Sequence, residues 1–143
     1  GYYAINENID LKNLTAFTSI DKNIYLSPVE KGATIRLSNI FFDFGKATLR
    51  AESFAELDRV VALLNENNKL SIQIQGHTDN VGDDTSNLTL SDNRAKAVKD
   101  YILKKGIKDS RVTFKGFGET KPLNKNTTDQ ERQENRRVEF LVL

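Results

Sequence analysis

Hydrophobic and polar residues alternate in several short stretches of this chain, a pattern typical of half-buried β-strands. The clearest case is Ile35 and Leu37, which stand between Thr34, Arg36 and Ser38. The other stretches that the same spacing predicts to be strands are 2–5, 24–26, 40–44, 70–75, 112–114 and 138–142. We therefore expect a small sheet, with two further short strands near the N-terminus.

Helical spacing separates these strands. Ser53 and Glu56 form a capping-box signature that predicts a helix over about 52–67. A polar loop from His77 to Asn87 precedes a second helix that runs to Lys105, with Gly106 just beyond it. Thr128 with Glu131 can cap a short third helix. Strands that alternate with helices predict an α/β (α+β) sandwich, a mixed sheet with helices packed on one face.

The length of 143 residues fits one compact domain with an appendage. We assign residues 1–32 to a strand-rich extension or the end of a preceding domain, and 33–143 to the domain itself. Because the chain starts at Gly1 and contains no Met, we expect it to be a piece of a longer protein.

Composition narrows the function classes. Lys plus Arg (21) nearly balances Asp plus Glu (20), so no broad positive field favours nucleic acid. No apolar stretch approaches the roughly 18 residues of a membrane span, and we expect no direct membrane insertion. Without Cys and with a single His, the sequence predicts no metal site and no cofactor.

Three polar clusters could meet at one edge of the sheet: 76–80 at a strand end, 87–94 at a helix start and 135–137 before the last strand. Strand ends and helix starts are common ligand sites in α/β architectures. From the residues alone, Asp79 and Arg94 would more often form a structural ion pair.

Two other side chains in these clusters leave alternatives open. Asn87 could cap the second helix, contact a ligand, or do both. His77 with Asp79 could suggest a catalytic or metal pair, but no second His, Cys or activated nucleophile supports it, so we expect no enzyme. His77 is then expected to brace its loop, and Arg137 to be solvated or salt-bridged.

At these segments the sequence resembles the outer-membrane-protein-A-like (OmpA-like) family. The motifs that carry the resemblance, over about residues 36–143, are 40–44 (IFFDF), 76–79 (GHTD), 87–91 (NLTLS) with Arg94 and Ala95, 116–119 (GFGE) with Pro122, and 126–139, which ends in NRRVE. The resemblance implies a βαβαβ(α)β fold and binding of diaminopimelate, the third residue of the stem peptide in most Gram-negative peptidoglycan.

The resemblance also implies roles for individual residues. Asp79 would hold the ammonium and Arg94 the carboxylate at the free end of the diaminopimelate side chain, which suits a zwitterion. The further positions that match the family's pocket are Thr78, Asn87, Arg136, Phe44 and Gly45. Two departures bear on the site: Gly45 replaces a small polar residue, and Glu131 replaces a Gly in the segment that leads to Arg136.

The resemblance implies a non-covalent wall anchor in the periplasm, attached to the outer membrane through parts of the parent protein outside this chain. Its partner would be the diaminopimelate stem peptide. The alternative is a protein-interaction or assembly module of an envelope machine, such as a secretion system or a stator, in which wall binding is regulated or lost.

Overall fold

The computed structural model describes residues 2–4 and 26–143. Its main sheet has four strands in the order β3-β6-β4-β5. The bounds of these strands are Thr34–Leu37 (β3), Ile72–Gly76 (β4), Val112–Gly116 (β5) and Val138–Val142 (β6). The helices are α1 (Phe54–Glu66), α2 (Asp84–Lys104) and α3 (Asp129–Asn135), with 3-10 turns at Ala51–Ser53 (η1) and Asp109–Arg111 (η2).

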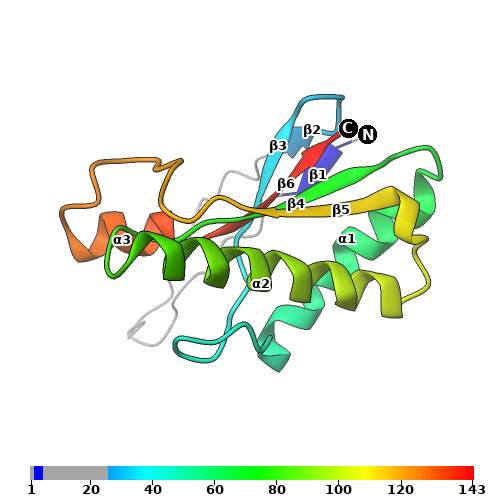
Figure 1. Ribbon diagram of the computed structural model, residues 1–143. Helices are drawn as coiled ribbons and strands as arrows, with labels where there is room; N and C mark the ends of the chain where they lie inside the picture. The colour runs from blue at the N-terminus through cyan, green and yellow to red at the C-terminus, as the bar shows by residue number, and fades with distance from the viewer. Residues whose placement is uncertain (1, 5–25) are drawn as a thin grey trace, which may run out of the picture.

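The sheet is mixed. β4 pairs in parallel with β5, whereas β6 runs antiparallel to both β3 and β4, so that Ile74 lies opposite Phe114 on one side and Phe140 on the other. Helices α1 and α2 cover the same face of the sheet, and α3 lies at one end, beside the start of α2 (Figure 1). The predicted fold class is confirmed.

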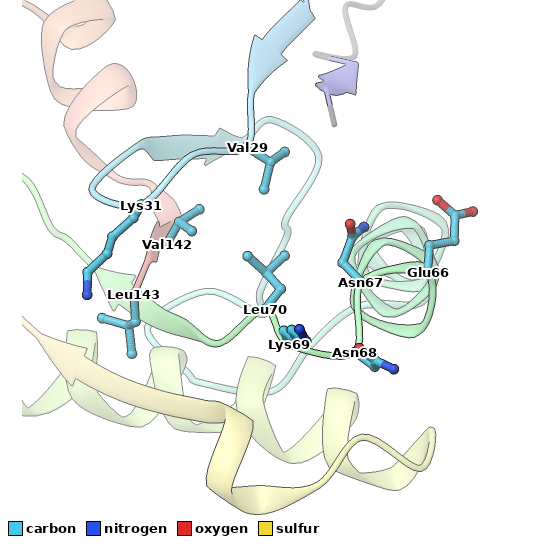
Figure 2. A pocket seen from close by; sticks show the side chains of 9 residues that line it. All are labelled: Val29, Lys31, Glu66, Asn67, Asn68, Lys69, Leu70, Val142 and Leu143. Atoms are coloured by element: carbon cyan, nitrogen blue, oxygen red, sulfur yellow. The ribbon is translucent and has the colours of Figure 1, made fainter.

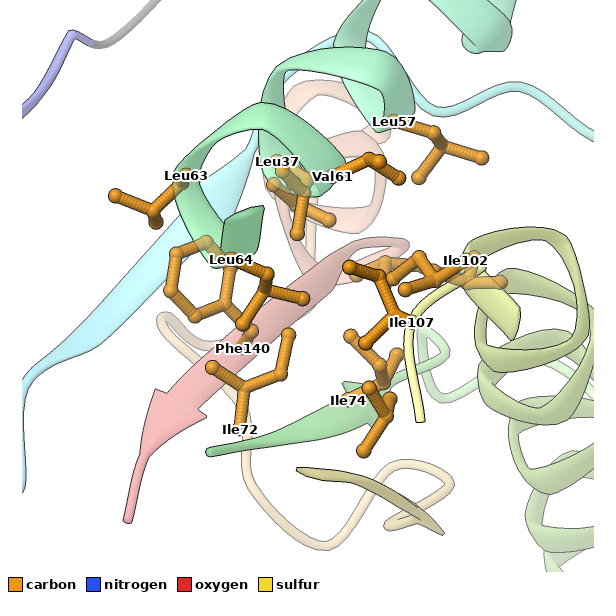
Figure 3. Packing of buried hydrophobic residues seen from close by; sticks show 14 of the residues in the cluster. Leu37, Leu57, Val61, Leu63, Leu64, Ile72, Ile74, Ile102, Ile107 and Phe140 are labelled. Carbon is orange, nitrogen blue, oxygen red and sulfur yellow. The ribbon is translucent and has the colours of Figure 1, made fainter. Parts of the chain in front are cut away.

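The core lies between the sheet and these two helices. Leu57 and Leu64 of α1 are completely buried, as are Ile72 and Phe140 of the sheet, and Figure 3 shows Leu64 directed at the last two. Buried apolar side chains of this size each stabilise the fold by about 1.5–3 kcal/mol. This core gives the strand ends a rigid support.

Two glycines bring α2 unusually close to the sheet. A Cβ atom on Gly76 would lie 2.2 Å from the carbonyl oxygen of Ser91, and one on Gly116 would lie 2.4 Å from the amide nitrogen of Asp92. The Ser91 hydroxyl also accepts a hydrogen bond of 2.8 Å from Gly118 N–H. The start of α2 is therefore fixed against the ends of β4 and β5.

The predicted strand at 40–44 is wrong. Only one isolated bridge, between Phe42 and Leu49, forms in this stretch, which is otherwise a loop. Phe41 is 41% exposed and Phe44 is fully exposed, so neither belongs to the core, whereas Phe42 packs against it. The alternation arose because the loop places Phe42 inward and its neighbours outward.

Two of the predicted helix starts need correction. Ser53 precedes α1 but does not cap it, because its hydroxyl bonds to the backbone N–H and C=O of Phe41. Helix α2 starts at Asp84, earlier than expected, since Asp83 accepts a hydrogen bond of 2.8 Å from Ser86 N–H and so serves as the N-cap.

The predicted end of the second helix and the predicted third helix are confirmed. Helix α2 ends at Lys104, with Lys105 as its C-cap. Gly106 follows with a φ of 95°, which lies in the left-handed region. Thr128 and Glu131 form the predicted capping box of α3. These signals were local in sequence, which is why they could be found there.

Near the N-terminus, β1 (Tyr2–Ala4) pairs antiparallel with β2 (Leu26–Pro28), which agrees with two short strands. The predicted strand residues Ile5, Ile24 and Tyr25 lie outside the described residues. The boundary between 1–32 and 33–143 remains a prediction. No helix in the described ranges is both long and apolar enough to span a membrane.

Candidate ligand-binding cleft

A cleft of about 610 Å³ lies where β4 ends, between the first half of α2, α3 and the loop at 40–45. It brings together all seven predicted site residues: Phe44, Gly45, Thr78, Asp79, Asn87, Arg94 and Arg136. The other residues that line it are Ile40, Phe41, Phe42, Asp43, Val81, Leu90, Arg132 and Gln133. Residues that are 92 positions apart in the sequence thus share one cavity of the size that binds small ligands.

Asp79 lies at the floor of this cleft, just beyond β4. The preceding Thr78 N–H donates to the carbonyl of Gly118 at 2.9 Å, which extends the pairing with the β5 side past the strand end. One oxygen of Asp79 accepts from Val81 N–H at 3.1 Å, and the other is ion-paired with Arg136. The carboxylate is only 11% exposed, so its orientation is fixed by both partners.

Arg94 projects from α2 and is held by the 40–49 loop. Its Nε donates to the carbonyl oxygen of Lys46 at 3.0 Å, and its guanidinium carbon lies 4.9 Å from the centre of the Phe42 ring. Burial lowers the pKa of Arg94, nearby Arg136 lowers it further, and Asp79 raises it. The group stays cationic because a guanidinium is not deprotonated in proteins.

Asp79 and Arg94 do not form the structural ion pair that their sequence spacing suggested. Within the described part of the chain, the ion-pair partner of Asp79 is Arg136, and the terminal nitrogens of Arg94 donate no hydrogen bond. Four N–H groups of Arg94 therefore remain for a ligand, since a guanidinium has five donors and one is used by Lys46.

Asn87 braces the loop beneath the cleft. Its side chain is 7% exposed, and its Nδ2 donates to the Glu119 carboxylate at 3.0 Å and to the Val81 carbonyl at 3.2 Å. It lies inside the first turn of α2 and not at the N-cap, so the capping alternative is wrong. Glu119 was not predicted as a supporting residue, although it belongs to the 116–119 motif.

Arg136 follows α3 and reaches back across the cleft. Its backbone N–H donates to the Arg132 carbonyl at 3.0 Å, and its Nη2 donates to the Gln133 side chain at 2.6 Å. Glu131, the departure in this segment, accepts from the N–H groups of Thr127 and Thr128 and stabilises the start of α3. Gln133 and Arg132 were missed as lining residues because helical spacing in so short a helix gives no clear inner face.

His77 lies outside the cleft chemistry. It is buried, stacks on Phe117 with ring centres 5.4 Å apart, and places Nε2 3.1 Å from Glu139. It is paired with Glu139, whereas the partners of Asp79 are Val81 and Arg136, so His77 and Asp79 do not form the pair that the sequence analysis set aside. No cluster of three metal-binding side chains occurs in the ranges that the structure covers.

Glu139 joins His77 to Arg137. Burial raises the pKa of Glu139, but hydrogen bonds from His77 and Arg137 outweigh it and lower this pKa to about 2. Arg137 is 7% exposed and pairs with Glu139 at 3.1 Å, so of its two predicted environments the salt-bridged one is correct. This cluster lies beneath the strand ends and stabilises them.

A second cleft, of about 470 Å³, lies between the end of α1 and the C-terminal end of β6 (Figure 2). Its charged side chains, Lys31, Glu66 and Lys69, are all exposed, and Figure 2 shows them around the rim of an open space. It contains no buried charge comparable to Asp79. The cleft at the end of β4 is therefore the better candidate.

Comparison with known proteins identifies the family of this chain. The family model described as "OmpA family" matches residues 41–136, which include every predicted site residue. Outer membrane porin F of Pseudomonas fluorescens is 34% identical over 116 residues, which are 81% of this chain and 35% of that protein. A protein of Gloeobacter violaceus named photosystem I P700 chlorophyll a apoprotein A2 is 42% identical over 122 residues, 80% of this chain and 14% of that protein. The chain thus spans only a minor part of these curated relatives.

Solved structures share the fold. A MotB-like protein from Desulfovibrio vulgaris has a TM-score of 0.70 at 34% identity, covering 76% of this chain and 71% of that one. The cell wall anchor of the type VI secretion system from Pseudomonas aeruginosa has a TM-score of 0.66 at 31% identity, covering 77% of this chain and 78% of that one. The peptidoglycan-associated lipoprotein from Burkholderia pseudomallei has a TM-score of 0.67 at 26% identity, covering 82% of this chain and 94% of that one.

The members of the OmpA family that match this chain are structural and binding proteins, not enzymes. The model match covers more than half of the sequence, and the solved relatives share its mixed sheet. On this evidence the chain belongs to the OmpA family.

Proposed function

We propose that this chain binds peptidoglycan non-covalently through the diaminopimelate residue of the stem peptide and so anchors an outer-membrane or periplasmic protein to the wall. One observation carries the proposal. Asp79 and Arg94 line one cleft with opposite charges, and the terminal nitrogens of Arg94 have no hydrogen-bond acceptor among the described residues.

Arg94 suits the ligand carboxylate. Its four remaining N–H groups can form a bidentate pair, which is the geometry that guanidinium groups prefer with carboxylates. Each hydrogen bond to a charged group contributes about 1.5–3 kcal/mol. Arg136, which lies close enough to lower the pKa of Arg94, adds positive potential at the same place.

Asp79 suits the ligand ammonium. Its carboxylate accepts from Val81 N–H and Arg136, yet a carboxylate has about four lone-pair sites and can accept from an ammonium as well. Thr78 supports this end of the site with a buried hydroxyl that has no partner among the described residues. The site therefore matches a zwitterion better than a simple anion.

The names of two structural neighbours point the same way, since one is a cell wall anchor and the other a peptidoglycan-associated lipoprotein. Both are envelope proteins by name, which supports a periplasmic location for this domain. We extend wall association to this chain on the strength of the cleft, which supplies the charges that the ligand needs.

Sedimentation with purified diaminopimelate-type peptidoglycan tests the proposal. We expect the unaltered chain to co-sediment with the wall material. Asp79→Ala and Arg94→Ala should each lower the affinity at least about tenfold, because the loss of one charged hydrogen bond costs that much. Arg50→Ala is the matched control: Arg50 lies near the same loop but pairs with Glu52 at the surface.

Full binding by both cleft variants would exclude this site. Absence of binding by the unaltered chain would favour the alternative, a protein-interaction or assembly module of an envelope machine, and would direct the search to protein partners. The resemblance to a secretion-system anchor and to a MotB-like protein makes such machines the first place to look.

A further inference from the structure

We propose that Phe42 is a positioning residue, which together with the Lys46 carbonyl holds the Arg94 guanidinium in the orientation that receives the ligand carboxylate. The inference rests on the proposed function and adds a residue whose side chain carries no charge. We call the Phe42 ring and the Lys46 carbonyl the Arg94 platform.

The geometry of the platform fixes one edge and one face of the guanidinium. Lys46 accepts from Nε at 3.0 Å, and the Phe42 ring lies 4.9 Å from the guanidinium carbon. The hydrogen bond occupies Nε and the ring restrains the guanidinium carbon, which leaves Nη1 and Nη2 to bind a ligand. An arginine fixed in this way loses less rotamer freedom when it captures a carboxylate.

The platform is itself rigid. Asp43 N–H donates to the Thr48 carbonyl and Lys46 N–H to the Asp43 carbonyl, each at 3.0 Å, which closes a tight turn. Phe42 bridges to Leu49, and both pack against the core. Gly45 adopts a φ of +65°, which a glycine accepts at no steric cost.

The loop at 40–49 departs from the strand predicted at 40–44, and the departure has a consequence for Arg94. The bridge at Phe42 and the turn at Gly45 bring both groups of the platform to Arg94 of α2, which is 48 residues away from Lys46 in sequence.

Calorimetric titration with two stem tripeptides tests the inference. One carries diaminopimelate and the other carries lysine, which lacks the side-chain carboxylate. We expect Phe42→Leu to lower the affinity for the diaminopimelate peptide about 3- to 10-fold, the range of a cation–π contact. The affinity for the lysine peptide should not change. Phe42→Tyr, which keeps the ring, should restore most of the lost affinity.

Two further measurements separate positioning from general damage. In Arg94→Ala, adding Phe42→Leu should cause no further loss, because the two residues act through the same contact. Phe114→Leu removes a partly buried ring that does not line the cleft and has the Lys99 ammonium 5.6 Å from its centre, so it should change stability but not affinity.

If Phe42→Leu fails to fold, Gly45→Ala takes its place. A Cβ at Gly45 meets no atom within 4 Å, so only the strained φ disturbs the turn, and the same selective loss of the diaminopimelate peptide is expected. Equal weakening of both peptides, or additive losses with Arg94→Ala, would overturn the inference. Failure of the unaltered chain to bind either peptide would instead defeat the proposed function.

Discussion

Five charged side chains line the cleft, and of its three cations Arg94 alone donates no hydrogen bond from its terminal nitrogens to a described residue. Asp79 is satisfied by Arg136 and by the Val81 amide, whereas Arg94 is held only through Nε and the Phe42 ring. Three cations against two anions give the lining a net positive charge, which favours an anionic group of the ligand beside Arg94. At the residue scale, we therefore expect the ligand carboxylate to bind Arg94 and the ligand ammonium to use the lone pairs left on Asp79.

Glu139 makes stability depend on pH. Because its pKa is lowered to about 2 from an ordinary value of 4.5, it stabilises the fold above pH 4.5, and that contribution is lost as pH falls towards 2. Glu139→Gln should therefore be less stable than the unaltered chain at pH 6. Chemical denaturation at several pH values should show this difference shrink between pH 4.5 and 2; a constant difference would contradict the assignment.

At the element scale, α3 controls where Arg136 enters the cleft. Its capping box is formed by Thr128, which accepts from Glu131 N–H at 3.1 Å, and the helix ends at the residue before Arg136. Thr128→Ala should lower the free energy of unfolding by about 1 kcal/mol. Thr128→Ser keeps the cap and should lose little. Denaturant titration of the three proteins measures this, and equal stability of all three would show that the cap does not matter.

The close approach of α2 to the sheet gives a larger expected effect. Gly76→Ala places a Cβ 2.2 Å from a backbone oxygen of α2, a clash that only backbone movement can relieve, and should cost about 2–3 kcal/mol. Gly106→Ala, at the end of α2, introduces only left-handed strain and should cost about 1–2 kcal/mol. The Tm measured by thermal unfolding should therefore be lower for Gly76→Ala than for Gly106→Ala. The opposite order would contradict the close packing of α2 on the sheet.

The sequence predicts most elements because their signals are local. The alternation in β3, β4 and β6 and the glycine after α2 needed no knowledge of distant contacts. The 40–44 stretch failed because the same alternation fits a loop that directs Phe42 inward, and Ser53 failed as a cap because its hydroxyl is used by Phe41. Both outcomes depend on contacts between segments.

For the candidate site, the sequence likewise indicates the residues but not the contacts between them. Family motifs named all seven predicted residues that line the cleft, but the partners of those residues could not be predicted. The ion pair of Asp79 with Arg136 spans 57 positions, and the hydrogen bond of Arg94 with Lys46 spans 48. Such pairings depend on the rotamers that the folded backbone allows, which residue types alone do not reveal.

At the scale of the whole molecule, recognition is local. The net charge of +1 supplies almost no long-range attraction, so affinity has to come from the few charges in the cleft. The core beneath the sheet, the glycines under α2 and the cap of α3 all hold segments that meet at this one end (Figure 1). The remainder of the domain acts as a rigid support.

The central claim is recognition of a zwitterionic side chain, and calorimetric titration of the unaltered chain with diaminopimelate and lysine tripeptides tests it most directly. Loss of the carboxylate leaves Arg94 without its partner, so we expect the lysine peptide to bind at least about tenfold more weakly. Saturable binding of the diaminopimelate peptide with this selectivity is the predicted result. Equal affinity for the two peptides, or no binding of either, would contradict the account.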